Sequence, residues 1–414
     1  MTDDRGTLRA IAWRELCPWL IIFRTFTLAL TLPLLFLATL AVMVQPLGWQ
    51  ASSLIFLSSD TLDADLELKA TTQFLQSWPI RYRDGGNFNW PALSAAVDLT
   101  SGDAQSIYHR LSLPFRQLFR LDLTLTEFCY FLFGGLWTLL IWAFVGGMIT
   151  RLAVVYLGRE ERISFKEALY YVGARYGSYF VAPLYPLIGV MLLAIPIALL
   201  GLLMQLDIGV LLAGLLWIFV IIAAVAMAFM LLGLLFGWPL LWPAISAENG
   251  DAFEAMSRSY GYTFQRPFHY LFFALVAAIF GALCWFFVSI FADLVVHLAW
   301  WGASWGTGVA RLKEIQDAAA IHDPEMASTM AAGTWLLNLV NGLVYCVAAG
   351  FGYSLFFCLG SAIYLLLRHV DDESELDEVF VEEDEDRFAL PQLSRDAAGV
   401  PAVETPETGV NEAE

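Results

Sequence analysis

Residues 209–245 read GVLLAGLLWIFVIIAAVAMAFMLLGLLFGWPLLWPAI and contain no charged side chain. A helix of about 20 residues crosses the hydrocarbon core of a bilayer, which is about 30 Å thick. The stretch is long enough to cross, and a helix leaves no backbone polar group unpaired in lipid. Five further apolar stretches lie at residues 26–48, 128–157, 179–204, 270–299 and 334–366. The sequence predicts an all-α, polytopic membrane protein with six transmembrane helices.

The composition supports this class of protein. Hydrophobic residues make up 59% of the chain and charged residues 15%, whereas soluble domains average about 45–50% and about 25%. Of the 40 Asp and Glu residues, 16 lie in residues 369–414, together with 2 of the 22 Lys and Arg. Because such a segment has little apolar surface to offset chain entropy, we expect residues 369–414 to form an acidic, disordered tail.

Cysteine and histidine, five of each, show no spacing typical of a metal or redox site. We expect no metal ion, no cofactor and no nucleic-acid partner. The sequence also lacks paired acids, a histidine cluster or a nucleophile with a neighbouring base, so we do not expect an enzyme.

Basic residues are typical of the cytoplasmic ends of transmembrane helices. They precede the first, third and fifth predicted spans and follow the sixth, as Arg5, Arg9, Arg14, Arg24, Arg159, Arg162, Lys166, Arg175, Arg258, Arg266 and Arg368. We therefore expect both termini in the cytoplasm.

This topology divides the chain into three parts. Residues 1–25 form a cytoplasmic amphipathic segment, residues 26–368 the membrane domain, and residues 369–414 the cytoplasmic tail. Residues 49–127 and 300–333 form two extracytoplasmic loops. The end of the first loop predicts an amphipathic helix that either lies on the membrane surface or caps the bundle, with its apolar side formed by Ile107, Leu111, Phe115, Leu118 and Phe119.

Two similar segments precede the third and fifth spans. Ser164 with Glu167, and Asp251 with Glu254, each fit a capping box, which predicts a short amphipathic surface helix at each place. Each segment is followed by a proline and two spans. The N-terminal segment is a degenerate third copy without the glutamate. The sequence thus predicts three repeats of a surface helix and a transmembrane hairpin.

The fourth span is too long for one straight crossing. Pro239 and Pro243 remove backbone donors, so the helix should kink or end near Gly237. A kinked helix that leaves the membrane and a re-entrant segment are both consistent with this pattern.

The segment Trp242-Pro243-Ala244-Ile245-Ser246-Ala247-Glu248, followed by Glu254-Ala255-Met256-Ser257-Arg258-Ser259, carries a family resemblance. A span that ends in proline, an acidic residue and a short E-A-x-x-R-S helix resemble bacterial multi-pass proteins related to the Yip1 and glycerophosphodiesterase membrane-domain groups. The resemblance covers approximately residues 150–300. It implies a helical protein of the bacterial cytoplasmic (inner) membrane that takes part in membrane organisation or trafficking rather than catalysis.

Polar side chains within apolar spans are the candidate functional residues. Asp293 and His297 are four residues apart and could sense protons, or lie at the membrane interface with a structural role. Asn338 and Asn341 could bind an ion or join helices by hydrogen bonds. Arg151 is expected to extend to the lipid headgroups.

The acidic tail contains four apolar residues at a spacing that could form one stripe of a short helix: Leu376, Val379, Phe380 and Val381. They could bind a basic cytoplasmic protein partner, or belong to a solvated spacer that projects from the membrane. For the whole chain we expect a non-enzymatic membrane-organising or protein-interaction module in contact with the lipid bilayer. The alternative is a transporter or permease.

Overall fold

Six helices in the described part of the chain are long and apolar enough to cross a membrane, which confirms the predicted all-α polytopic fold. The computed structural model describes residues 17–58, 65–78, 104–320, 328–381, 393–395 and 401–403. The spanning helices are α3 (Leu32–Phe56), α8 (Leu125–Arg159), α11 (Leu184–Leu203), α12 (Asp207–Glu248), α14 (Pro267–Thr307) and α16 (Ser328–Asp371). The protein is an integral membrane protein.

The first predicted span is divided into two helices. A 3-10 turn, η1 (Pro18–Leu20), leads into α2 (Ile21–Ala29), and two residues separate α2 from α3. Thr31 is extended (ψ 140°) and Pro33 stands in the first turn of α3. Because proline suits the start of a helix better than its interior, the chain breaks there. The expected amphipathic segment 1–25 lies mostly outside the described residues.

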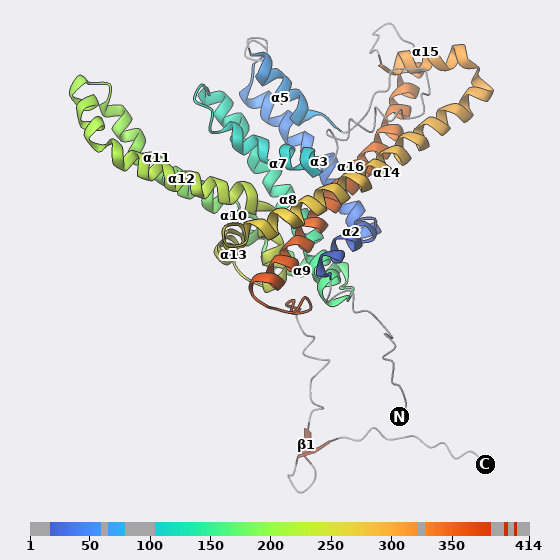
Figure 1. Ribbon diagram of the computed structural model, residues 1–414. Helices are drawn as coiled ribbons and strands as arrows, with labels where there is room; N and C mark the ends of the chain where they lie inside the picture. The colour runs from blue at the N-terminus through green and yellow to red at the C-terminus, as the bar shows by residue number, and fades with distance from the viewer. Residues whose placement is uncertain are drawn as a thin grey trace, which may run out of the picture. The chain divides into compact units, whose positions relative to one another are not determined.

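Helices α8 and α16 form the centre of the bundle (Figure 1). α16 packs on α2, α3, α8, α12 and α14, and α8 packs on α3 and α12. Small residues allow these close approaches, because a Cβ added to Gly146 of α8 would overlap Trp242, and one added to Gly360 of α16 would lie 2.9 Å from the Pro239 carbonyl oxygen. Such glycine-mediated contacts are typical of helices packed in membranes.

Helices α11 and α12 form a hairpin that meets the centre of the bundle only at one end. In the most apolar 18-residue segment of each helix, 11% of the residues of α11 and 6% of those of α12 are buried, against 83% in α16. Figure 1 shows the two helices side by side, extending away from α8 and α16. Most of the hairpin surface is therefore left for lipid.

The expected kink near Gly237 does not end α12. The helix continues through Pro239 and Pro243 to Glu248 and stops where Asn249 adopts a left-handed conformation (φ 60°), so the re-entrant alternative is wrong. Pro239 leaves the carbonyl oxygen of Leu235 without its helical donor. The Tyr108 hydroxyl donates to that oxygen. A side chain from elsewhere thus replaces the lost backbone hydrogen bond.

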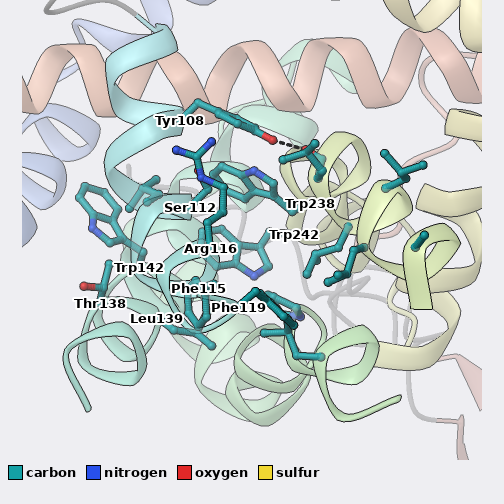
Figure 2. A pocket seen from close by; sticks show the side chains of 18 residues that line it. Tyr108, Ser112, Phe115, Arg116, Phe119, Thr138, Leu139, Trp142, Trp238 and Trp242 are labelled. Carbon is teal, nitrogen blue, oxygen red and sulfur yellow. Dashed lines mark hydrogen bonds between the residues drawn. The ribbon is translucent and has the colours of Figure 1, made fainter. Parts of the chain in front are cut away.

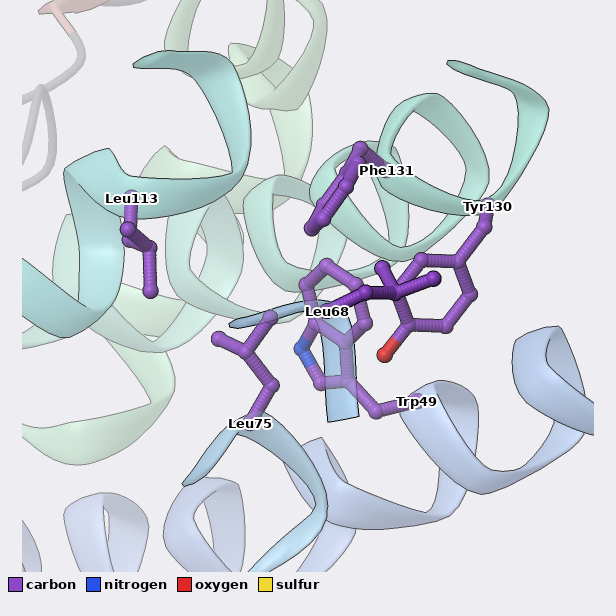
Figure 3. Close-up of a cluster of buried hydrophobic side chains, with 6 residues drawn as sticks. All are labelled: Trp49, Leu68, Leu75, Leu113, Tyr130 and Phe131. Atoms are coloured by element: carbon purple, nitrogen blue, oxygen red, sulfur yellow. The ribbon is translucent and has the colours of Figure 1, made fainter. Parts of the chain in front are cut away.

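Residues 49–127, expected as a loop, are largely helical where they are described. α3 continues to Phe56, and α5 (Leu66–Gln76) and α7 (Ala104–Gln117) follow. They pack with the start of α8 around an apolar cluster of Trp49, Leu68, Leu75, Leu113, Tyr130 and Phe131 (Figure 3). α7 also contacts α14 and α16. It therefore caps the bundle, which decides between the two alternatives for the amphipathic helix.

The second expected loop, residues 300–333, is shorter than predicted. α14 extends to Thr307, α15 (Val309–Ala320) follows, and α16 begins at Ser328. The helices are therefore longer than the apolar stretches by which they were identified.

Three short helices lie at the end of the bundle opposite α5 and α15 (Figure 1): α9 (Phe165–Ala174), α10 (Tyr176–Val181) and α13 (Ala252–Gln265). We call this the α13 end. Ser164 and Glu167 form the complete capping box. Asp251 accepts from the Glu254 amide at 2.8 Å, but the Glu254 carboxylate contacts Arg258 instead of completing the box.

The boundary of the tail differs from the expected one. Residues 371–379 pack with the membrane domain, and only residues 380–414 form a separate unit. In that unit, β1 (Leu393–Arg395) and β2 (Pro401–Val403) pair as an antiparallel hairpin, with Ser394 opposite Ala402. Composition alone could not predict that residues 371–379 pack on the membrane domain. Asp371 and Asp372 bind Arg266 and Arg258, which lie more than 100 residues earlier in the chain.

Candidate functional site

An apolar pocket of about 570 Å³ lies where the α11–α12 hairpin meets α7 and α8 (Figure 2). Its size is within the range of about 300–1,000 Å³ that is typical of small-molecule sites. Its lining consists of Tyr108, Leu111, Ser112, Phe115, Arg116, Phe119, Thr138, Leu139, Trp142, Pro183, Leu187, Ala228, Leu231, Leu232, Leu234, Leu235, Trp238 and Trp242.

The tryptophans make the pocket apolar because polar atoms of two of them bind elsewhere. The Trp142 indole nitrogen donates to the Gln45 side chain at 3.0 Å, and the Trp242 nitrogen donates to the Tyr179 carbonyl at 2.9 Å. The ring of Trp142 also stacks on Tyr353 at 4.3 Å. These contacts fix the rings, whose carbon surfaces remain to line the pocket.

Arg116 is the one charged side chain among the described residues that line the pocket. It lies among the aromatic side chains in Figure 2. Its Nη2 lies 2.7 Å from Nδ1 of His109, which is two turns earlier on the same face of α7. Partial burial, and secondarily the charge of Arg116, lower the pKa of His109 below 6.5. The imidazole is therefore neutral at neutral pH and accepts from the guanidinium.

The wall formed by α12 is held by hydroxyl groups from other helices. Besides Tyr108, Tyr260 of α13 donates to the Met230 carbonyl at 2.6 Å, and Ser259 donates to the Gly237 carbonyl at 2.6 Å. From α14, Tyr270 donates to the Phe236 carbonyl at 2.6 Å. All four acceptors lie in the part of α12 that borders the pocket. The pocket wall is thus positioned largely by α13 and α14.

The four polar residues proposed from sequence lie elsewhere. Asp293 and His297 on α14, and Asn338 and Asn341 on α16, are all half-buried. These helices pack against each other through a cluster of Ala292, Tyr345 and Ala348, with Val288, Val296 and Val344 beside it. None of the four polar residues lines the pocket.

Arg151 does not extend to the headgroups as expected. It is 3% exposed, and its Nη1 donates to the Ser246 carbonyl at 2.6 Å. Its guanidinium lies 3.8 Å from the centre of the Tyr171 ring, a cation–π distance. The hydroxyl of Ser246 also bonds Thr150 and Tyr179. The arginine therefore joins α8, α9 and α12, which a charge pattern alone does not reveal.

The apolar tail residues do not form a helical stripe. Residues 373–375 and 378–381 have no helical structure, Val379 is 4% exposed, and Leu376 is half-buried. Phe380 and Val381 belong to the second unit. Leu376 and Val379 lie against Gly158 at the end of α8. Two of the proposed partner-binding residues are thus already in contact with the membrane domain.

None of the functional residues proposed from the sequence lines the pocket. Arg116 was one of several bases in an outer loop, and nothing in its immediate sequence distinguishes it. The available signal was the concentration of Trp142, Trp238 and Trp242 in two long spans.

The described residues contain no group of three or more His, Cys, Asp or Glu side chains that could hold a metal ion. No family model, curated protein or solved structure matches the chain. The pocket is therefore the best-defined candidate site.

Proposed function

We propose that this protein is a non-enzymatic membrane module that binds a lipid in the pocket and so organises lipid around its diverging helices. The observation that carries the proposal is an apolar pocket of about 570 Å³ whose described lining has a single charge, on Arg116. An acyl chain can fill such a space, because most of its lining is apolar. An anionic headgroup can bind the guanidinium by charge-assisted hydrogen bonds.

The chemistry of the lining favours binding over catalysis. The described lining residues include hydroxyls of tyrosine, serine and threonine but no carboxylate and no thiol. Acid–base or nucleophilic catalysis needs a nucleophile or a titratable group with a partner that activates it. The resemblance noted in the sequence, around Trp242 and Arg258, also agrees with membrane organisation rather than chemistry.

We also propose that the α13 end faces the cytoplasm of a bacterium and that the protein lies in its inner membrane. The arginines near this end support the orientation, because positive charge is typical of cytoplasmic loops. The arrangement of α9 before α11 and α12, and of α13 before α14 and α16, supports a duplication of surface helix and hairpin.

Photo-crosslinking tests the lipid proposal. The protein is reconstituted in nanodiscs with a phosphatidylglycerol or a phosphatidylcholine that carries a photoreactive acyl chain. We expect crosslinked peptides from α7, α8 and α12 at the pocket. Ala228→Trp, which fills the pocket, should abolish these crosslinks, whereas Ala224→Trp, at an exposed position one turn away on α12, should not.

A second pair of variants tests the headgroup. Arg116→Gln should reduce the preference for phosphatidylglycerol by about tenfold, the effect of losing a charged hydrogen bond. Arg311→Gln, at an exposed arginine of α15, is the matched control. Crosslinks spread evenly over the lipid-facing helices and unchanged in Ala228→Trp would overturn the proposal. Solute flux in proteoliposomes that Ala228→Trp blocks would favour the transporter alternative.

A further inference from the structure

The chain turns back on the bundle at the end of α16. Asp371 accepts from Arg266 Nε at 2.9 Å, and Asp372 pairs with Arg258 Nη1 at 3.2 Å. The Tyr262 hydroxyl donates to the same Asp372 oxygen at 2.6 Å. Arg258 and Tyr262 belong to α13, and Arg266 follows it directly. We call residues Asp371–Val379 the strap.

The backbone of the strap also makes contacts with the membrane domain. The Arg368 guanidinium, 6% exposed, donates to the Ser374 hydroxyl at 2.9 Å and to the carbonyl oxygens of Glu375 and Glu378. At the far end of the strap, a Cβ added to Gly158 would lie 2.6 Å from the Leu376 carbonyl oxygen and 2.7 Å from Val379 Cγ2. The seat for Val379 therefore depends on a glycine at position 158.

The helix that the strap holds is also the helix that holds the pocket wall. Ser259 and Tyr260 of α13 donate to carbonyls of Gly237 and Met230 in α12. These acceptors flank Leu231, Leu232, Leu234 and Leu235, which line the pocket. A continuous set of contacts thus runs from Asp372 through α13 to the pocket wall.

The ionic contacts of the strap are weak enough to be released. The side chains of Arg258 and Arg266 are 38% and 46% exposed, and exposed ion pairs are readily screened by water and salt. Arg258 also pairs with Glu248 and Glu254, so it keeps partners when Asp372 leaves. Release of the strap therefore leaves no uncompensated charge on α13.

We infer that the strap controls the lipid pocket, because it sets how firmly α13 holds the α12 wall and the base of the α11–α12 hairpin. The inference rests on the proposed function for its lipid but on the contacts above for its mechanism. With the strap bound, the hairpin is fixed against α8 and α16. With the strap released, the hairpin moves at its base and the pocket changes width.

The test measures the hairpin and the lipid separately in full-length protein in nanodiscs. Spin labels at Leu211 of α12 and Leu66 of α5, both exposed, report the distance between the hairpin tip and the core. Asp371→Asn combined with Asp372→Asn should broaden the distance distribution and speed hydrogen exchange of α13. The yield of the pocket crosslink should change by about fivefold or more, the range of ordinary coupling between sites.

Two further variants separate the causes. Gly158→Leu displaces Val379 without altering a charge and should have the same effect as the double variant. Asp377→Asn neutralises an exposed acid of the same segment and should have none, as should deletion of residues 380–414, which form a separate unit.

An unchanged distance distribution in both the double variant and Gly158→Leu would overturn the inference. A broader distribution with an unchanged crosslink would also overturn it, since the strap would then brace the hairpin without affecting the pocket. Absence of any pocket crosslink in the unmodified protein would contradict the proposed function instead. The distance measurement would still test whether the strap fixes the hairpin.

Discussion

Helix α16 and the α11–α12 hairpin place apolar residues in opposite environments. In the most apolar segment of each helix, 83% of the residues of α16 are buried, but only 11% of those of α11 and 6% of those of α12. The buried helix nevertheless contains more small and polar residues, among them Gly350, Ser354, Gly360 and Ser361. In lipid, apolar surface needs no burial, while close helix packing needs small residues and paired polar groups. Burial in this protein therefore follows packing rather than apolar character.

The largest expected effect tests this contrast directly. Gly360→Leu places a side chain against the Pro239 carbonyl, 2.9 Å from its Cβ, between two well-packed helices. We expect a loss of about 3 kcal/mol or more, or failure to fold. Gly214→Leu on α12, where nothing lies within 4 Å of an added Cβ, should be nearly neutral. Thermal unfolding in detergent measures both, and similar melting temperatures would contradict the comparison.

Loss of a buried charge comes next. Arg151→Met removes the donor to the Ser246 carbonyl and the cation–π contact with Tyr171. We expect destabilisation of about 2–3 kcal/mol, which combines a charged hydrogen bond with a desolvated cation–π contact. Arg311→Met on α15, at an exposed arginine, provides the control. Equal unfolding midpoints for the two variants would mean that Arg151 is not structural.

A single hydroxyl should have a smaller effect. Tyr108→Phe leaves the Leu235 carbonyl, already deprived of its helical donor by Pro239, without the hydrogen bond that replaces it. The expected cost is about 1 kcal/mol, together with a wider pocket. Tyr170→Phe, at a residue 72% exposed on α9, should be neutral. Chemical unfolding measures the change in stability, and the yield of the pocket crosslink measures the change in the pocket. If Tyr108→Phe changes neither, the hydrogen bond from Tyr108 to Leu235 does not stabilise the pocket wall.

The smallest effect concerns pH. Burial and Arg116 lower the pKa of His109 in the folded protein below 6.5, so the folded state binds this proton less readily than the unfolded state. The contribution is constant above pH 6.5 and is lost as pH falls from there through the folded pKa. Melting temperature should drop slightly more between pH 7.5 and pH 5 in the unmodified protein than in His109→Gln. An identical drop in both would show that folding does not lower the pKa of His109.

The repeat provides an example of what patterns in the sequence can predict. Ser164 and Glu167 form the expected capping box because all of its groups lie within four residues. Glu254 fits the same pattern but contacts Arg258, which in turn pairs with Glu248 and with Asp372. A local rule is reliable only while no distant residue competes for the same side chain.

The pocket could not be predicted for a similar reason. Its lining comes from α7, α8, α11 and α12, and Arg116 enters it because α7 caps the bundle rather than lying on the membrane. The candidates chosen from sequence, such as Asp293 and Asn338, were selected as polar residues in apolar spans. They lie on α14 and α16, two helices that pack against each other, and neither lines the pocket. Polarity within a span does not by itself distinguish a functional role from a structural one.

The sequence by itself determined the six membrane-spanning helices, because the length of an apolar stretch relative to the bilayer is a local property of the chain. It did not determine which helices become buried, how α12 continues through two prolines, or where the tail begins. Those features depend on Tyr108, Tyr270 and Ser259 reaching carbonyls of α12, and on Asp371 and Asp372 reaching arginines more than 100 residues away. Only tertiary structure decides such pairings, since each requires two distant segments to approach within hydrogen-bond distance.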